Sequence, residues 1–216
     1  MNQTIVFGDI HGCYDEWREL IDTIQPDSSD QLFSVGDMIG KGPHSRKVLD
    51  LAHRLSNFRS VMGNFEQYLV RKWRENALAS IDDPRVLVAL RDLESDIDRY
   101  LEWIATWPLY LDLEKCLILH AGLTPGIPLH KQDPDDLVNI RTFGAPAKPW
   151  YDFYQDDKLI VHGHWAKQGL VIRNNVIGLD TGCVYGKKLT ALILPERKFV
   201  SVPAKKVYVP IHPAQE

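Results

Sequence analysis

The sequence predicts an α/β fold, and three observations support this prediction. Short apolar segments alternate with amphipathic segments over the first 66 residues, as strands and helices alternate in βαβ units. Each of the first three apolar segments runs into a Gly-Asp or Gly-Asn pair, and these pairs begin at Gly8, Gly36 and Gly63. Their separations of 28 and 27 residues match the length of a βαβ unit. After residue 108, short strand-like segments predominate.

The first 66 residues contain this pattern in its clearest form. We expect strands over 4–7, 32–35 and 58–62, because these segments are short and apolar. The intervening segments, 14–24 and 45–55, place apolar residues at positions i, i+3, i+4 and i+7, which gives each helix one apolar stripe that can cover a sheet. The first stripe consists of Trp17, Leu20, Ile21 and Ile24, and the second of Val48, Leu51, Ala52 and Leu55.

The segment 66–107 mixes apolar residues with many charges and has no strand pattern, so we interpret it as a helical insert within a single domain of residues 1–216. Strands are expected again over 109–113 and 116–119. Prolines then mark a loop-rich stretch around a short helix over 135–141. The remaining expected strands are 159–161, 170–177, 189–194 and 199–202.

The composition excludes several classes of protein and suggests a location. The chain has 216 residues, a net charge of −4, 44% hydrophobic and 25% charged residues, which is unlike a disordered chain, a coiled coil or a disulfide scaffold. This charge also argues against bulk nucleic-acid binding. Three cysteines without a C-x-x-C pair suit a reducing compartment. No basic leader, and no apolar run near the roughly 20 residues that span a bilayer, is visible, so we expect a cytoplasmic protein without membrane contact.

Polar residues follow several of the expected strands. In open α/β sheets, ligands collect beyond the carboxyl ends of the strands, where Asp9, Asp37 and Asn64 fall. Carboxylate, amide and imidazole groups without a thiolate suit manganese, iron, zinc or magnesium. With the histidines near the first strand and after two later ones, the candidate ligands are Asp9, His11, Asp37, Asn64, His120 and His164.

Each of these features alone has an ordinary structural explanation. Gly-Asp and Gly-Asn pairs are common turns, and an isolated histidine is about as often a hydrogen-bonded core residue as a metal ligand. The combination of three such turns at one βαβ period with three histidines at strand ends favours a metal site.

The motifs also resemble those of the phosphoprotein-phosphatase branch of the calcineurin-like metallophosphoesterases, over most of the chain. The matching motifs are Gly8-Asp9-Ile10-His11-Gly12, Gly36-Asp37 ending at Gly42, Gly63-Asn64, His120-Ala121-Gly122 and Gly163-His164. Within that branch, Gly-His-Trp-Ala at 163–166 and Leu-Asp-Thr-Gly-Cys at 179–183 are similar to bacterial symmetrical diadenosine tetraphosphatases. The segments 33–37 and 63–67 also look like those of the lambda phage protein phosphatase.

This resemblance implies a four-layer αββα fold, a β-sandwich flanked by helices on both faces, with two divalent metal ions. Asp37 would bridge the two ions, one held also by Asp9 and His11 and the other by Asn64, His120 and His164. Such a pair binds phosphate and activates water for direct in-line attack. Manganese is the first expectation, with iron, zinc and magnesium as alternatives. Lys41 and Arg141 match the positions of the family's phosphate-binding arginines.

The sequence departs from the family pattern at three positions. Gly40 stands where the family has an aspartate, and Lys41 replaces an arginine, keeping the charge but losing the bidentate fork. Phe65 occupies the position of the histidine that acts as general acid for the leaving group, and phenylalanine cannot donate a proton. His162 and His44 are candidate substitutes, so the catalytic acid stays unassigned.

Without a general acid at position 65, substrates are expected to differ in rate according to whether their leaving group needs a proton. A general acid contributes roughly 10²- to 10⁴-fold, which matters most for a leaving group that needs a proton. Serine leaves as an alkoxide, whereas a nucleotide released from an anhydride leaves as a phosphate whose second pKa is about 6. We therefore expect hydrolysis of diadenosine tetraphosphate or related dinucleoside polyphosphates. The alternatives are a serine/threonine protein phosphatase, whose partner is a phosphoprotein, and a catalytically impaired pseudo-phosphatase that acts as a binding module.

Overall fold

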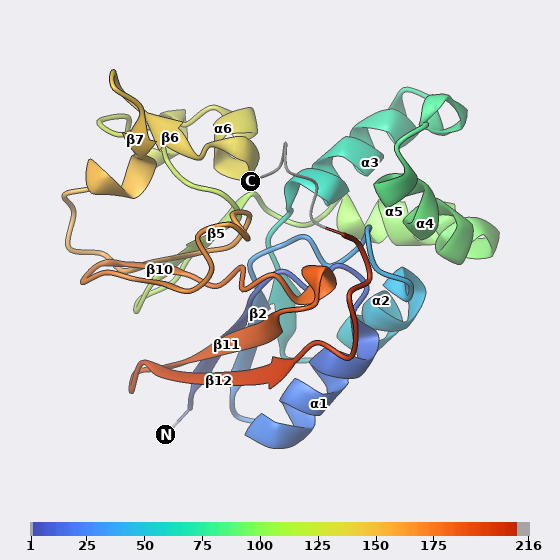
Figure 1. The fold of residues 1–216 in the computed structure, drawn as a ribbon, viewed down its shortest axis with the longest axis horizontal. Helices are drawn as coiled ribbons and strands as arrows, with labels where there is room; N and C mark the ends of the chain where they lie inside the picture. Colours follow the sequence, from blue (N-terminus) through green and yellow to red (C-terminus); the bar gives the residue numbers. More distant parts are fainter. Residues whose placement is uncertain (1, 211–216) are drawn as a thin grey trace.

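The computed structural model describes residues 2–210, and residues 1 and 211–216 of the predicted domain lie outside the described part. Two five-stranded sheets pack face to face, with helices on the outer sides (Figure 1). In order across the first sheet, the strands are β12 (Lys198–Pro203), β11 (Lys188–Leu194), β1 (Thr4–Phe7), β2 (Gln31–Ser34) and β3 (Phe58–Ser60). Across the second sheet they are β4 (Tyr110–Asp112), β5 (Leu117–Leu119), β8 (Ile160–His162), β10 (Val176–Gly178) and β9 (Val171–Ile172).

The remaining elements are one small hairpin and the helices. The hairpin pairs β6 (Thr142–Phe143) with β7 (Lys148–Pro149). The helices are α1 (Tyr14–Ile24), α2 (Ser45–Arg54), α3 (Asn64–Arg74), α4 (Pro84–Leu93), α5 (Ile97–Ile104) and α6 (Pro134–Asn139). None of the described helices combines the length and apolar character that crossing a membrane requires.

The first sheet confirms the two predicted βαβ units. Strands β1, β2 and β3 run parallel and are joined by α1 and α2, which lie on the outer face of the sheet (Figure 1). Because parallel strands end at the same edge, the loops after β1, β2 and β3 meet there. In the second sheet, β5, β8 and β10 are also parallel to one another.

The core has three parts, as a sandwich with covered outer faces requires. Alternate residues of β1 point to opposite sides, so Ile5 and Phe7 pack under the helices while Val6 packs between the sheets. The part between the sheets also contains Phe33 and Val161. The outer face of the second sheet is covered mainly by α6 and loops, which contribute Leu137 and Trp150 among others. This arrangement confirms the predicted β-sandwich with flanking helices.

Helices α3, α4 and α5 occupy most of the segment 66–107 and lie together at one side of the first sheet (Figure 1). Leu69, Val86 and Leu101 are buried and join the same core as α1 and α2. Helix α4 begins with Asp83, whose side chain accepts a hydrogen bond from the backbone N–H of Arg85 at 2.9 Å.

Two local predictions were wrong or incomplete. The segment 170–177 is not one strand but two antiparallel strands, β9 and β10, because Arg173, Asn174 and Asn175 form a turn between them. The β6–β7 hairpin was not predicted, since two-residue strands are too short to show a periodic pattern.

Candidate functional site

Asp37 is the centre of the candidate metal site. Its Oδ2 lies 3.3 Å from Nε2 of His11 and 3.6 Å from Nε2 of His120, and all three residues are buried. Donor atoms of Asp9, Asp37 and His120 lie within 4.8 Å of one another. The loops after β1, β2 and β5 therefore bring four of the candidate ligands to one point.

The other two candidate ligands, Asn64 and His164, join this group through contacts with His120 and Asp9. The Oδ1 of Asn64, the first residue of α3, lies 3.0 Å from Nε2 of His120 and 3.1 Å from Nδ1 of His164. The backbone N–H of His164 donates to Oδ2 of Asp9 at 3.1 Å. All six side chains named from the sequence thus lie around one centre.

The rings of two histidines are oriented as metal ligands usually are. The Nδ1–H of His120 donates to the carbonyl of Val35 at 2.8 Å, and the Nδ1–H of His11 donates to the carbonyl of Ile39 at 3.2 Å. A carbonyl can only accept, so these bonds fix the tautomer and leave an unprotonated Nε2 on the Asp37 side of each ring. Such outer partners are typical of histidines that bind metals.

Burial and neighbouring charges shift the pKa values of three candidate ligands. Burial, followed by repulsion from Asp180 and Asp37, raises the pKa of Asp9 well above its usual value. Burial alone would also raise the pKa of Asp37, but His120, His11 and Lys41 together lower it to about 2. Burial, followed by the charge of Lys41, lowers the pKa of His11 to about 3, so this imidazole is neutral and able to coordinate.

An ammonium group already stands beside one of the candidate ligands. The Nζ of Lys41 donates to Nε2 of His11 at 2.7 Å, among the carboxylates that surround this position. The buried oxygen and nitrogen donors, their fixed rings and this stand-in cation fit a pair of divalent metal ions.

Two glycines make room for the carboxylates. A Cβ atom on Gly163 would lie 2.0 Å from Oδ1 of Asp9, and one on Gly63 would lie 2.3 Å from Oδ1 of Asp37. Any larger residue at either position would therefore displace a ligand.

Backbone strain is concentrated at the same place. Seven described residues other than glycine have a positive φ, and four of them belong to the site. These four are His11 (46°), Asp37 (49°), Lys41 (58°) and His164 (69°). Non-glycine residues in this region are costly and tend to cluster at functional sites, which supports a role for these loops.

Glu66 holds two of the ligand loops together. Its buried carboxylate accepts hydrogen bonds from backbone N–H groups of Asp37, of the two residues after it, and of the residue before Asn64. These donors are Asp37 (2.8 Å), Met38 (2.9 Å), Ile39 (3.1 Å) and Gly63 (2.9 Å). Burial and the charge of Asp37 raise the pKa of Glu66 to about 8, against the effect of these hydrogen bonds.

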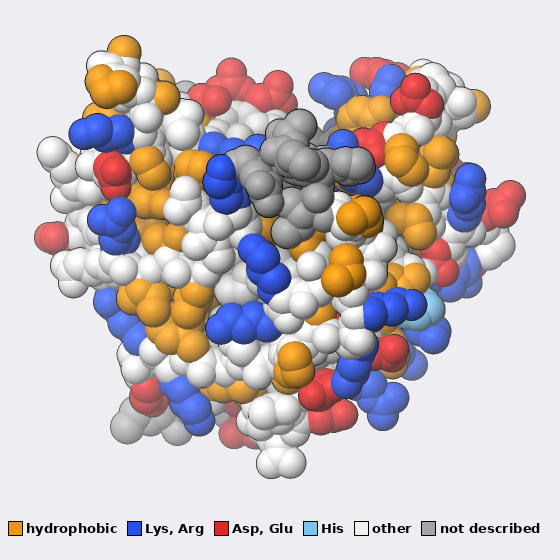
Figure 2. All heavy atoms as spheres, in the orientation of Figure 1, with side chains coloured by type: hydrophobic (Ala, Val, Ile, Leu, Met, Phe, Trp, Pro, Cys, Tyr) orange, Lys and Arg blue, Asp and Glu red, His pale blue; other side chains and the backbone are white. Residues whose placement is uncertain are grey.

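A cavity of about 450 Å³ opens onto the ligands. Its wall carries two carboxylates, those of the candidate ligand Asp37 and of Asp180. The remaining charged lining residues are all cationic, namely Lys41, Arg85, Arg141, Lys167 and Lys187. The aromatic lining residues are Phe65, Trp165 and Tyr185. On the face drawn in Figure 2, lysine and arginine side chains lie both near the centre and along the edges, whereas acidic side chains lie mostly toward the periphery.

The two catalytic departures in the sequence are spatially coupled. Gly40 has a φ of +83°, and a Cβ atom there would lie 2.4 Å from the Phe65 ring. The phenyl ring thus fills the space that a side chain at position 40 would need. Lys41 lies over the same ring, with its Nζ 4.7 Å from the Phe65 centroid and 5.3 Å from that of Tyr185.

Neither candidate substitute for the general acid lines this cavity in the described part of the chain. His162 is buried against Trp150 and Tyr151, and burial lowers its pKa to about 4. His44 precedes α2, and its backbone N–H donates to the carbonyl of Gly12 at 3.1 Å.

Several residues of the cavity were not predicted. Asp180 follows β10 by two residues, so the rule that identified the other strand-end ligands would have found it. Arg85 gave no comparable signal, since it is one of many charges in the helical segment. The structure shows that Arg85 is held by Asp83, with Nη2 to Oδ2 at 2.6 Å, and that its carbonyl accepts from the N–H of Lys41.

Comparisons with known proteins agree with this geometry. The profile of the calcineurin-like phosphoesterase family matches residues 3–196. The chain is 30% identical to an asymmetrical bis(5'-nucleosyl)-tetraphosphatase of Oceanobacillus iheyensis, over 94% of this chain and 93% of that protein. It is 27% identical to a symmetrical bis(5'-nucleosyl)-tetraphosphatase of Erwinia tasmaniensis, over 94% and 98% of the two chains. A solved structure provisionally assigned as a diadenosine tetraphosphatase superimposes with a TM-score of 0.83 at 29% identity, over 94% of both chains.

Proposed function

The chain belongs to the calcineurin-like phosphoesterase family and is a metal-dependent phosphohydrolase, and we propose that it hydrolyses dinucleoside polyphosphates such as diadenosine tetraphosphate. The names of its relatives support this substrate class. The observation in this chain that carries the proposal is the cationic wall of the cavity.

That wall suits a chain of phosphates better than a single phosphate. Five cationic residues surround the cavity, contributed by loops and by α4. Each charge-assisted hydrogen bond between such a residue and a phosphate oxygen is stronger than a neutral one, and arginine can contact two oxygens at once. Lys41 and Arg141 are proposed to hold the reacting phosphate, and Arg85, Lys167 and Lys187 the rest of the polyphosphate.

The aromatic residues support the same class. Trp165 and Tyr185 line the cavity beside the cations, and flat rings of this kind can stack on a nucleobase. They belong to the segments after β8 and β10.

The absence of a histidine at position 65 fits a substrate whose leaving group needs no proton. Phe65 lines the cavity and presents only carbon atoms to it, and Gly40 offers no carboxylate beside it. A nucleotide leaving through a phosphate oxygen departs as a stable anion. Hydrolysis of a phosphoserine, in contrast, would lack the protonation of the alkoxide that the general acid supplies in the family.

We propose that Asp9, His11 and Asp37 hold one divalent cation and that Asp37, Asn64, His120 and His164 hold a second. Manganese is the proposed ion. When bound, two such cations supply Lewis-acid polarisation of a phosphoryl group and lower the pKa of water. The ring of His11 must then release Lys41, which is free to turn toward the cavity and contact phosphate. The three free cysteines suit a reducing compartment, and we propose the cytoplasm.

The test is manganese-dependent hydrolysis of three substrates by one preparation: diadenosine tetraphosphate, para-nitrophenyl phosphate and a phosphoserine peptide. We expect the highest kcat/KM on diadenosine tetraphosphate. A higher value on the phosphopeptide would overturn the proposal in favour of a protein phosphatase. Chromatography of the products assigns the cleaved bond, since two ADP indicate symmetrical cleavage and AMP with ATP indicates asymmetrical cleavage.

A further inference from the structure

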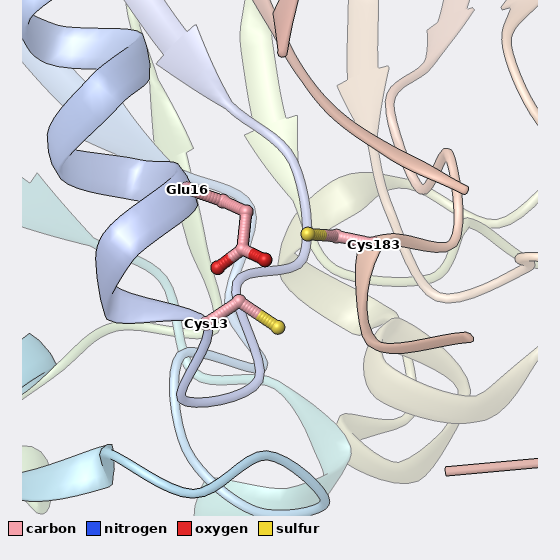
Figure 3. A group of neighbouring side chains, drawn as sticks. All are labelled: Cys13, Glu16 and Cys183. Atoms are coloured by element: carbon pink, nitrogen blue, oxygen red, sulfur yellow. The ribbon is translucent and has the colours of Figure 1, made fainter. Parts of the chain in front are cut away.

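A second group of potential metal ligands lies outside the candidate metal site. The side chains of Cys13, Glu16 and Cys183 point toward a common space (Figure 3). One donor atom of each lies within 4.8 Å of the other two, and all three residues are at most 1% exposed. Cys13 caps α1 and Glu16 lies in its first turn, three positions later, so the two side chains share one face of the helix.

Only one of the two carboxylate oxygens of Glu16 has hydrogen-bond partners among the described residues. Its Oε1 accepts hydrogen bonds from the backbone N–H of Lys205 and from the hydroxyl of Tyr208, both at 2.8 Å. Its Oε2 is fully buried and has no hydrogen-bond partner among the described residues. A buried carboxylate oxygen without a partner is costly, and it needs either a donor or a cation.

From this arrangement we infer that Cys13, Glu16 and Cys183 form a binding site for a thiophilic divalent cation of the zinc type. Two thiolates and a carboxylate oxygen are common ligands of zinc, and three protein ligands leave one tetrahedral position for another donor. The carboxylate favours Zn²⁺ over Cu⁺, which prefers sulfur ligands alone. The site uses the unpartnered Oε2, which a disulfide between the two cysteines would leave unsatisfied.

The charge balance of binding is favourable for a buried site. Each thiol loses its proton when it becomes a ligand, so one Zn²⁺ replaces two protons and the net charge of the cluster does not change. The fold therefore does not have to bury an additional charge.

The distances require only a small contraction. Zinc–sulfur bonds of about 2.3 Å in tetrahedral geometry place two thiolates roughly 3.8 Å apart. The three donor atoms already lie within 4.8 Å of one another, so each needs to move by about 1 Å or less.

This site is chemically distinct from the proposed catalytic centre, which contains no sulfur. It is nevertheless connected to the cavity, because Cys13 follows the loop of His11 and Cys183 follows that of Asp180. A cation bound to both cysteines links these loops and the C-terminal segment that Glu16 holds. We expect it to stabilise the fold by mass action, in addition to any effect of metals at the catalytic centre.

The experiment is a titration of the full, reduced and metal-free protein with Cd²⁺, read by the ultraviolet charge-transfer absorbance of cadmium–thiolate bonds. Only cysteines give this signal, so ions at the catalytic centre are silent. We expect saturation at one Cd²⁺ per chain and reversal by excess Zn²⁺. The affinity for Cd²⁺, read from this absorbance, is expected to fall by roughly 100-fold or more in Cys13→Ala and in Cys183→Ala. In Glu16→Gln it is expected to fall by roughly tenfold or more.

Cys116→Ala is the matched control, because Cys116 is equally buried but lies between the sheets, away from the other two cysteines. It is expected to bind Cd²⁺ like the natural protein. Circular dichroism of each variant checks that it is folded. If a cysteine variant does not fold, Glu16→Gln, which keeps both cysteines, still tests the site. Unchanged binding in Cys13→Ala or Glu16→Gln would overturn the inference. The absence of a cadmium–thiolate signal from the reduced, folded protein would also overturn it, whether or not the two cysteines form a disulfide.

Discussion

The two sides of the cavity differ in how closely they follow the family pattern. On one side, the six candidate ligands are all present, most of them buried, with their rings and loops fixed by hydrogen bonds. On the other side, Phe65 and Gly40 stand where the family pattern has a histidine and an aspartate. The Phe65 side is nevertheless filled, since the phenyl ring occupies the space over Gly40.

This difference separates two tasks of a phosphohydrolase. The metal ions proposed for the ligand side would hold positive charge next to the reacting phosphoryl group, which every substrate of this reaction requires. In the proposed function, the Phe65 side would determine which leaving groups can depart, because protonation matters only for poor ones. The packed arrangement of Gly40 and Phe65 therefore points to a narrower substrate range, whereas loss of the ligands would point to loss of activity.

The largest expected effect is on the ligand side. Asp37→Ala removes the carboxylate shared by both proposed cations, and we expect hydrolysis of diadenosine tetraphosphate to fall by about 10³-fold or more. Isothermal titration with Mn²⁺ would show the loss of binding directly. Retained turnover in a preparation of this variant free of other hydrolases would contradict the proposed metal centre.

On the other side, Phe65→His is expected to change substrate preference. A histidine there can protonate a leaving group, so we expect a gain of up to roughly 10²-fold on a phosphoserine peptide. The gain on diadenosine tetraphosphate is expected to be much smaller, because its leaving group needs no proton. If Phe65→His raised the rate on both substrates equally, position 65 would not act through protonation of the leaving group, which contradicts the role proposed for the Phe65 side.

Arg85 tests the proposed contact with the polyphosphate. Removal of a charge-assisted hydrogen bond in Arg85→Ala is expected to raise KM for diadenosine tetraphosphate about tenfold. Hydrolysis of para-nitrophenyl phosphate, which has a single phosphate, is expected to stay unchanged. Arg91→Ala, an exposed residue of the same helix, is the control and is expected to alter neither reaction.

A double-mutant cycle tests the packing of Gly40 against Phe65. Gly40→Ala is expected to lower the free energy of unfolding by about 1 to 3 kcal/mol, because its Cβ overlaps the phenyl ring. In a Phe65→Ala background the overlap is removed, so the cost of Gly40→Ala is expected to be smaller by about 1 kcal/mol. Chemical denaturation of the four proteins measures this coupling. If Gly40→Ala lowers the free energy of unfolding equally in both backgrounds, the overlap with Phe65 does not contribute, and the loss is due only to the strain of the positive φ.

The smallest expected effect concerns His162, which belongs to neither side. We expect His162→Gln to keep diadenosine tetraphosphate hydrolysis within about threefold, as for most residues outside the reacting site. The folded pKa of about 4 lies below the ordinary value of 6.5, so the unfolded state binds a proton that the folded state does not. The natural protein is therefore expected to lose stability relative to the variant as pH falls from 6.5 toward 4, by at most about 1.4 kcal/mol per pH unit. Denaturation of both proteins across this range measures the difference.

Much of the fold and of the ligand set could be predicted from the sequence, because both depend on local patterns. The bounds of β1 and α1 follow from apolar periodicity, and Asp9 and Asp37 follow from the rule that ligands gather at strand ends. The β9–β10 turn was missed because the apolar residues on both sides of 173–175 concealed it.

The cavity wall could not be predicted in the same way. Arg85 reaches the cavity only through the packing of segments distant in sequence, and nothing in its neighbours distinguishes it. The overlap between Gly40 and Phe65 likewise depends on the path of two loops in space. Side-chain identities at these positions suggested a catalytic loss, whereas their contacts show a well-packed replacement.

The hydrogen bonds to Glu66 have a consequence for how metal ions enter. Since four backbone N–H groups of the two loops are already fixed by one carboxylate, the ligands are preorganised before any ion arrives. Little chain entropy is then lost on loading, and exchange of one ion for another leaves the backbone in place. The amides of Asp37, Met38, Ile39 and Gly63 are accordingly expected to resist hydrogen–deuterium exchange in the metal-free protein as well as in the loaded one.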